Sequence, residues 1–324
     1  MPISGPASYL PTIELFLSHW DEVNTALGAG GPLMLPGGVE RSNLADTRDE
    51  MEEARDAVTD NGVDRSLARA DLNGKIAALQ ARMVEFNARI RGDLPVTPIA
   101  EALPLAFALG DGEASVRDGL RKIARLWTKV NAITPTPPGV TLPLKLSGDY
   151  ALAAFNTDRD ALRDAYRALS DAEVELAVAR GGRNKLQDVI YPLLKEYRQK
   201  VLGLAPNFPQ LVETLPALTP PEGRTPQAVQ AQGAWDVPLT AAKITWGASV
   251  DADLQEYEVR GVPGDDYQGE DETVLGSIPA GGARELVTLF GLGSPGVTCG
   301  YKVYVVLTTG NERGSEALYV TRPG

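Results

Sequence analysis

An internal duplication constrains the fold of this chain more than any other feature of its sequence. Two copies of one pattern align at a shift of 111 residues. Toward the N-terminal end of each copy the shift is 107 residues, so the loop between the two registers differs in length by four residues. The matched motifs combine proline, glycine, paired charges and tryptophan: Pro32–Gly37 with Pro143–Gly148, Arg48-Asp49 with Arg159-Asp160, and Trp20 with Trp127. Repetition at a fixed spacing indicates repeated structural units. We expect helical repeats at residues 1–110 and 111–215.

The duplication also helps to distinguish residues that hold the fold from residues that could take part in chemistry. A residue present in both copies is expected to hold the fold, whereas a residue present in one copy is incidental or specialised. Trp20 and Trp127 occupy matched positions among apolar neighbours, so we predict that both are core anchors. The alternative is that they are exposed platforms on which sugars stack.

Each repeat shows the 3.6-residue apolar periodicity of helices. A first helix is expected near residues 10–27 and 116–133, followed by a loop rich in glycine and proline. Longer helical patterns then cover about residues 40–91 and 149–203. One interpretation is a single helix of roughly 75 Å in each copy, and the other is a hairpin of half that length. The turn signals Asp60-Asn61-Gly62 and Gly181-Gly182 do not coincide, which favours single helices, with a kink at Pro192.

After a proline-rich linker at 216–228, the apolar period changes from 3.6 to 2. Short alternating segments separated by turn signals predict a β-sandwich of six or seven strands at residues 229–324. The expected strands contain Ile244-Thr245-Trp246, Tyr257–Arg260, Val274-Leu275, Glu285–Leu289, Tyr301–Val306 and Ala317–Val320. The fold class is therefore multidomain α and β: a tandem-duplicated helical domain followed by an immunoglobulin-like sandwich.

This region resembles a fibronectin type III domain over about residues 235–322. The resemblance is carried by Ile244-Thr245-Trp246, by Asp253-Leu254 with Tyr257–Arg260, and by Tyr301–Val306 with Thr309–Ser315. The resemblance implies a structural role for Trp246, and we predict that Tyr257 and Tyr301 are structural residues as well. It also implies a spacer or binding module. The loops lack the Arg-Gly-Asp tripeptide of integrin-binding members, and no ligand site is carried over.

Composition excludes several classes of function. A formal net charge of −12 opposes non-specific binding to nucleic acid and docking on anionic membranes. Residues 229–324 hold 13 Asp/Glu and 6 Lys/Arg, a net charge of −7, so acidity is densest there. We expect no membrane-spanning segment, and with one cysteine no intrachain disulfide. No signal peptide is recognisable, so a surface or extracellular location, which is favoured over the cytoplasm, implies non-classical export.

Few residues suggest chemistry. His19 is the sole histidine and matches Leu126 in the second copy, and Cys299 is the sole cysteine, so both are predicted to be structural. Five carboxylates in an acidic loop could bind Ca²⁺, although a solvated loop is the alternative. They are Asp265, Asp266, Glu270, Asp271 and Glu272. A set of sandwich tyrosines is expected to be partly exposed and suited to a protein interface: Tyr257, Tyr267, Tyr301, Tyr304 and Tyr319.

These observations predict a non-catalytic structural protein with no cofactor. Duplication offers two quasi-equivalent surfaces, which suits self-assembly into a bacterial surface, filamentous or phage-like structure. The expected partner is the protein itself. The alternative is a ligand-binding or adhesion protein whose sandwich loops, especially 262–272, recognise a glycan or another surface protein. An enzyme is a third class, for which no catalytic constellation is visible.

Overall fold

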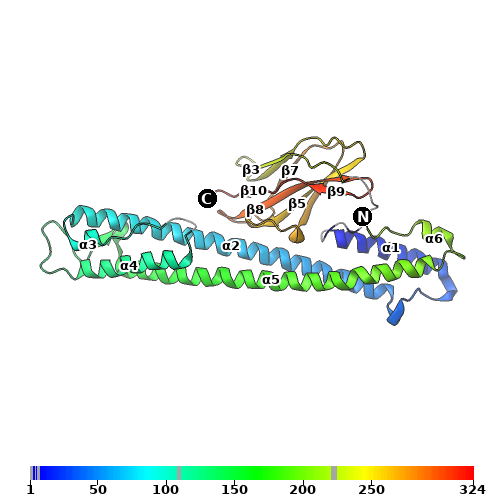
Figure 1. Ribbon diagram of the computed structural model, residues 1–324, viewed down its shortest axis with the longest axis horizontal. Coiled ribbons are helices and arrows are strands. Elements are labelled where there is room, and N and C mark those ends of the chain that lie inside the picture. Colours follow the sequence, from blue (N-terminus) through cyan, green and yellow to red (C-terminus); the bar gives the residue numbers. More distant parts are fainter. Residues whose placement is uncertain (1–2, 4, 6–7, 108–110, 220–224) are drawn as a thin grey trace. The chain divides into compact units, whose positions relative to one another are not determined.

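The computed structural model describes residues 3, 5, 8–107, 111–219 and 225–324 (Figure 1). The predicted linker is described only in part, because residues 220–224 lie outside these ranges, as do residues 108–110 at the predicted junction of the repeats. The chain divides into two compact units. The first unit combines Met1–Ser66 with Val174–Gly324, and the second is Leu67–Glu173.

The two long helical patterns are single helices, α2 (Arg41–Asp93) and α5 (Leu152–Leu202). The hairpin alternative is wrong. Helix α5 continues through Gly181-Gly182 and through Pro192. Each helix contributes one part to each unit, so its packing on two hydrophobic cores stabilises it where glycine and proline weaken its own propensity.

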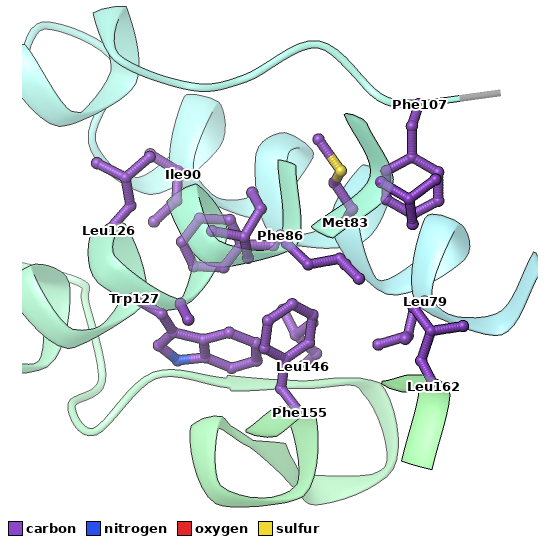
Figure 2. Packing of buried hydrophobic residues seen from close by; sticks show 14 of the residues in the cluster. Leu79, Met83, Phe86, Ile90, Phe107, Leu126, Trp127, Leu146, Phe155 and Leu162 are labelled. Carbon is purple, nitrogen blue, oxygen red and sulfur yellow. The ribbon is translucent and has the colours of Figure 1, made fainter. Parts of the chain in front are cut away.

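The second unit is a helical bundle closed by a short β ladder. It contains the C-terminal part of α2, α3 (Pro98–Glu101), α4 (Glu113–Asn131) and the start of α5. Strands β1 (Lys145–Leu146) and β2 (Tyr150–Ala151) pair in the loop before α5. Figure 2 shows its core, in which the Trp127 side chain lies next to Phe86 and Phe155. The ring centroids are 5.1 Å apart for Phe86 and Trp127 and 5.7 Å apart for Phe155 and Trp127.

The first unit holds a bundle of the same construction. It contains α1 (Tyr9–Leu27), the start of α2, the end of α5 and α6 (Pro209–Glu213). Trp20 is fully buried and its ring centroid lies 4.6 Å from that of Tyr197. Tyr197 stands one duplication shift from Phe86. The two bundles therefore place an aromatic residue of a long helix against a tryptophan of a short one.

The loop after each short helix is held by the same two hydrogen bonds. In the first copy the indole of Trp20 donates to the Leu33 carbonyl at 3.3 Å, and the Leu33 amide donates to Asn24 Oδ1 at 2.8 Å. In the second copy Trp127 donates to the Leu144 carbonyl at 3.1 Å, and the Leu144 amide donates to Asn131 at 2.8 Å. Retention of tryptophan and asparagine in both copies is explained by these loop bonds.

The copies exchange their aromatic contacts. Phe86 belongs to the first repeat but packs on Trp127 of the second, and Tyr197 of the second repeat packs on Trp20 of the first. Reciprocal contacts of this kind define an isologous interface, in which residue i meets j′ and j meets i′. The duplicated chain thus has the internal bonding pattern of a homodimer joined into one polypeptide.

The C-terminal region of the first unit consists of two antiparallel sheets. One has the order β3-β4-β7 and the other β10-β8-β5-β6, with β9 also paired to β8 (Figure 1). The bounds are β3 (Ala231–Asp236), β4 (Ala241–Trp246), β5 (Leu254–Pro263), β6 (Thr273–Pro279), β7 (Glu285–Thr288), β8 (Thr298–Leu307), β9 (Glu312–Gly314) and β10 (Leu318–Thr321). Strand β3 was not expected from the sequence pattern, and β9 lies within Thr309–Ser315, a segment that the family resemblance assigns to a loop and the last strand.

Both sheets contribute to one hydrophobic core, which includes Ile244 of β4, Val259 of β5 and Val303 of β8. Alternation along β5 turns Tyr257 and Val259 into that core and places Glu258 and Arg260 on the opposite face. None of the helices in the described ranges is long and apolar enough to cross a membrane.

Candidate functional site

His19 is a structural hydrogen-bonding residue of the first bundle. Its side chain is buried, with Nε2 2.9 Å from the Leu211 carbonyl oxygen and Nδ1 2.6 Å from the Tyr197 hydroxyl. A carbonyl only accepts, so Nε2 donates, and in a neutral imidazole Nδ1 accepts the hydroxyl proton. The matched positions of the second bundle hold Leu126 and Phe86, so there the polar pair is replaced by an apolar one.

The structural role of His19 can be tested by giving the first bundle the residues of the second. The single variant His19→Leu is expected to lose about 1–3 kcal/mol of unfolding free energy, because the buried Tyr197 hydroxyl is left without an acceptor. Adding Tyr197→Phe reproduces the Leu126/Phe86 pair and is expected to recover most of that loss. Urea denaturation of both variants measures the effect. A double variant no more stable than the single one would contradict the exchange.

Cys299 does not have the surroundings of a nucleophile. The thiol is buried, and its sulfur lies 3.2 Å from the Val262 carbonyl oxygen. Burial raises its pKa to about 12, which keeps it protonated at neutral pH.

The predicted aromatic anchors and tyrosines differ in exposure. Trp246 is buried against Tyr257, with ring centroids 5.7 Å apart. Tyr257 and Tyr301 are fully buried rather than partly exposed, because both point into the shared core. Tyr319 is 45% exposed. The expected tyrosine interface is therefore wrong for two of its five members.

The acidic loop does not gather its carboxylates around one point. Asp265, Asp266 and Glu270 are exposed, whereas Asp271 and Glu272 are buried and paired with arginines. Within the described ranges, no group of three or more His, Cys, Asp and Glu side chains is placed to hold a metal ion. The Ca²⁺ hypothesis thus has no coordination geometry in this part of the chain.

Arg260 is the centre of a buried ion cluster on the outer face of the β10-β8-β5-β6 sheet. Its guanidinium contacts Glu258, lies 3.1 Å from Glu272 Oε2 and reaches Glu312 Oε2 at 2.5 Å. It also lies 3.8 Å above the ring centroid of Tyr304, whose hydroxyl donates to Glu272. The side chains of Arg260, Glu258 and Glu272 are each 3% exposed.

The ring of Tyr304 can lie flat in this cluster because of its neighbour on β9. A Cβ added to Gly314 would be 2.8 Å from the Tyr304 Cζ atom, closer than real Cβ contacts. Strand β9 also supplies Glu312, two residues before this glycine. This short strand therefore provides both a carboxylate and the space for the ring.

Three carboxylates, those of Glu258, Glu272 and Glu312, share the charge of the Arg260 guanidinium. Burial raises the pKa of Glu258, against the attraction of Arg260. A raised pKa means that the folded state holds the proton more tightly than the unfolded chain does. The stability that this group adds is complete below the unfolded carboxyl pKa of about 4.3 and is lost as pH rises through the folded pKa.

Removing this titration is expected to flatten the pH dependence of stability. We expect the melting temperature of Glu258→Gln, relative to the unaltered protein, to increase as pH rises from about 4 to 7. Calorimetry across that interval measures the difference. Glu316→Gln is the control, because it removes an exposed carboxylate that is not among the charges acting on Glu258. A difference that falls with pH would contradict the direction of the pKa change.

A second buried ion pair connects α5 to the loop before β6. Asp271 ends a 3-10 turn (Gly269–Asp271), and its carboxylate accepts from Arg180 Nε at 2.7 Å and from Arg183 Nη1 at 2.9 Å. Arg183 also donates to the Glu270 carbonyl. The side chains of Arg183 and Asp271 are 2% and 4% exposed.

Comparison of the copies marks Arg183 as specialised. One duplication shift before Arg183 stands Leu72, which is part of the hydrophobic core of the second unit. A charged residue in the register of a core leucine is the signal by which sequence reasoning could have found this ion pair. Arg180 corresponds to Arg69 and carries no such signal.

A cleft of about 420 Å³ lies beside the Arg260 cluster within the first unit. Its walls come from α1, α2, β5 and β6 and from the residue before α1, and consist of Ser8, Leu10, Pro11, Glu14, Arg48, Arg55, Glu258, Arg260, Val274 and Ser277. Arg55 also lines a smaller cavity next to Arg183 and Asp271. The sequence pattern indicates no binding role for these arginines. Arg48 stands out only as part of the duplicated Arg-Asp pair, and each of them lies among charges typical of an exposed helix or strand.

Comparison with known proteins gives limited similarity. No protein-family model matches the chain, and no curated protein sequence matches it. Among solved structures, an Fn3-like protein from Clostridium thermocellum is 17% identical, covering 31% of this chain and 97% of that one, with a TM-score of 0.24. The pectate lyase PelI from Erwinia chrysanthemi, in complex with tetragalacturonic acid, is 14% identical over 29% of this chain, with a TM-score of 0.24. This chain matches 28% of the length of the lyase.

Proposed function

We propose that the protein is a non-catalytic structural protein that assembles with copies of itself, as a subunit of a bacterial surface, filamentous or phage-like assembly. The observation that carries this proposal is the reciprocal packing of Phe86 on Trp127 and Tyr197 on Trp20. Such contacts are those of a homodimer fused by duplication. A chain of this kind presents two quasi-equivalent surfaces to further copies.

We further propose that the two-sheet region is a fibronectin type III-like sandwich held by the helices. The sheet order β3-β4-β7 opposite β6-β5-β8 supports this, with β4, β5 and β8 as strands B, C and F and with β9 and β10 as strand G. The buried Arg183–Asp271 ion pair supports fixed rather than flexible attachment. A sandwich fixed in this way serves as a positioned contact surface in an assembly.

The test is the assembly state of the full-length protein. Light scattering during size-exclusion chromatography, with negative-stain microscopy of the same sample, is expected to show regular oligomers, sheets or filaments that grow with concentration. A strictly monomeric protein at all concentrations would overturn self-assembly as an intrinsic property. The same measurement with added Ca²⁺ is expected to give the same result.

Variants on the surface of α5 sharpen this test. Val174, Val178 and Val189 are each more than half exposed and lie on one side of this helix by their spacing. Introducing charge by Val178→Glu with Val189→Glu is expected to reduce assembly if this side contacts another copy. Val250→Glu is the matched control, because Val250 is 76% exposed in the two-sheet region. Equal loss in both would indicate a general effect of charge instead.

The alternative function is ligand binding or adhesion, with the sandwich loops recognising a glycan or protein. One observation favours a binding role, although not at those loops: the cleft beside Arg260 contains an arginine that forms no ion pair with any described residue. A monomer that binds a small ligand at this cleft would favour the alternative.

A further inference from the structure

Arg55 differs from every other arginine around the cleft. Arg48 contacts Glu14 and Glu52, and Arg260 contacts three glutamates. The Arg55 guanidinium makes no hydrogen bond and no ion pair within 4 Å to any residue that the structure describes, although the Arg55 backbone carbonyl accepts from Thr59 Oγ1. The side chain lines both the cleft and the smaller cavity. Its donors are therefore available to a molecule that enters the cleft.

The environment of Arg55 favours an anion. Its side chain is half-buried, and burial lowers its pKa. Arg183 and Arg260 act in the same direction, and Asp56 and Glu52 act in the opposite one. A partly desolvated guanidinium that forms no ion pair with a described residue is stabilised by a bound counter-ion. Three arginines and two glutamates line the cleft. Arg48 and Arg260 are already paired with glutamates, so the charge of Arg55 is the one left for a ligand, and it suits a single negative charge better than two.

The other residues that line the cleft indicate which further chemical groups a bound anion would have. Glu14 and Glu258 present carboxylates, which accept hydrogen bonds from hydroxyl groups. Leu10, Pro11 and Val274 supply an apolar side. A planar carboxylate matches the fork of a guanidinium, whereas a phosphate dianion would meet the two glutamates with excess charge. The volume of about 420 Å³ falls in the range of sites for small organic ligands.

We propose that this cleft binds a small hydroxylated monocarboxylate, such as a sugar acid, with its carboxylate on Arg55 and its hydroxyls on Glu14 and Glu258. The site is independent of self-assembly, since its lining residues all belong to one chain. None of the residues that line the cleft belongs to the acidic loop 262–272, the expected ligand-binding loop, although Arg260 pairs with Glu272 of that loop.

The test is calorimetric titration of the full-length protein with D-glucuronate, D-glucose and inorganic phosphate. We expect saturable binding of glucuronate, no saturable binding of glucose, and binding of phosphate at least about tenfold weaker than that of glucuronate. Arg55→Gln is expected to weaken glucuronate binding about tenfold or more, because a charge-assisted hydrogen-bond pair is lost. Arg55→Lys keeps the charge without the fork and is expected to be intermediate.

Two further variants keep the result interpretable. Arg89→Gln removes an exposed arginine of the same helix, which pairs with Asp93 outside the cleft, and is expected to bind as the unaltered protein does. Val274→Trp fills the cleft without changing a charge and is expected to abolish binding even if Arg55→Gln fails to fold. The proposal is overturned if glucuronate does not saturate, if Val274→Trp or a folded Arg55→Gln binds normally, or if phosphate binds as tightly.

Discussion

Replacing Asp271 with alanine is expected to destabilise the first unit by about 3–5 kcal/mol, as expected when one partner of a buried ion pair is removed. Asp271 accepts from Arg180 and Arg183, and the Arg183 side chain is 2% exposed. Without the carboxylate, a guanidinium stays buried with no counter-charge. Calorimetric melting of the full-length protein measures the loss, which belongs to the transition of the first unit, the one that contains the C-terminal part of α5 and the two sheets.

The duplication supplies the compensating change. In the second unit the position equivalent to Arg183 is Leu72, so Asp271→Ala combined with Arg183→Leu removes both buried charges and inserts the side chain found in the other copy. Buried ion pairs replaced by apolar residues are often neutral in stability, and we expect the double variant to recover most of the loss. Arg180 stays about one-third exposed and is solvated.

The control for this experiment is a second carboxylate of the same loop. Asp266 is exposed, and its contact is with Gln268. Asp266→Asn is expected to change stability by no more than about 0.5 kcal/mol. If Asp271→Ala were as mild as Asp266→Asn, the Arg183 ion pair would not hold the loop to α5.

The contrast between Asp271 and Asp266 also shows how far the sequence could predict this site. Five carboxylates in eight positions look alike in a sequence, and both a calcium loop and a solvated loop fit them. What separates them is the turn at Gly269–Asp271, which directs Asp271 and Glu272 inward. The arginine partners of Asp271 lie 91 and 88 residues earlier in the chain, and that of Glu272 lies 12 residues earlier on the preceding strand. The local sequence pattern does not predict these ion pairs.

In the helical part, too, the sequence predicts the local elements but not the contacts between distant residues. Periodicity located α1, α4 and the long helices, and the mismatch of turn signals favoured continuous helices, as the structure has them. The duplication identified Phe86 and Tyr197 as equivalent. It did not reveal which tryptophan each of them meets, because a repeat that packs on itself and a repeat that exchanges its helix have the same sequence pattern.

Truncating either tryptophan of the two bundles is expected to cause the second large loss of stability. Trp20 and Trp127 are fully buried, and each indole donates to a loop carbonyl. Truncation to alanine removes a large apolar side chain and that hydrogen bond, so each variant is expected to lose about 3–5 kcal/mol. Because the two sites are built alike, the losses are expected to be similar, each in the transition of its own unit.

Double-mutant cycles then distinguish exchanged from self-contained repeats. We use leucine at each position so that the variants stay folded, and measure unfolding by urea and calorimetry. Phe86→Leu and Trp127→Leu are expected to be coupled by about 0.5–3 kcal/mol, because their rings are in contact although they belong to different copies. Phe86→Leu and Trp20→Leu belong to the same copy but to different cores, and their losses are expected to add. Coupling in the second cycle and additivity in the first would show that each repeat packs on itself. The opposite result supports the fused-dimer architecture on which self-assembly is proposed.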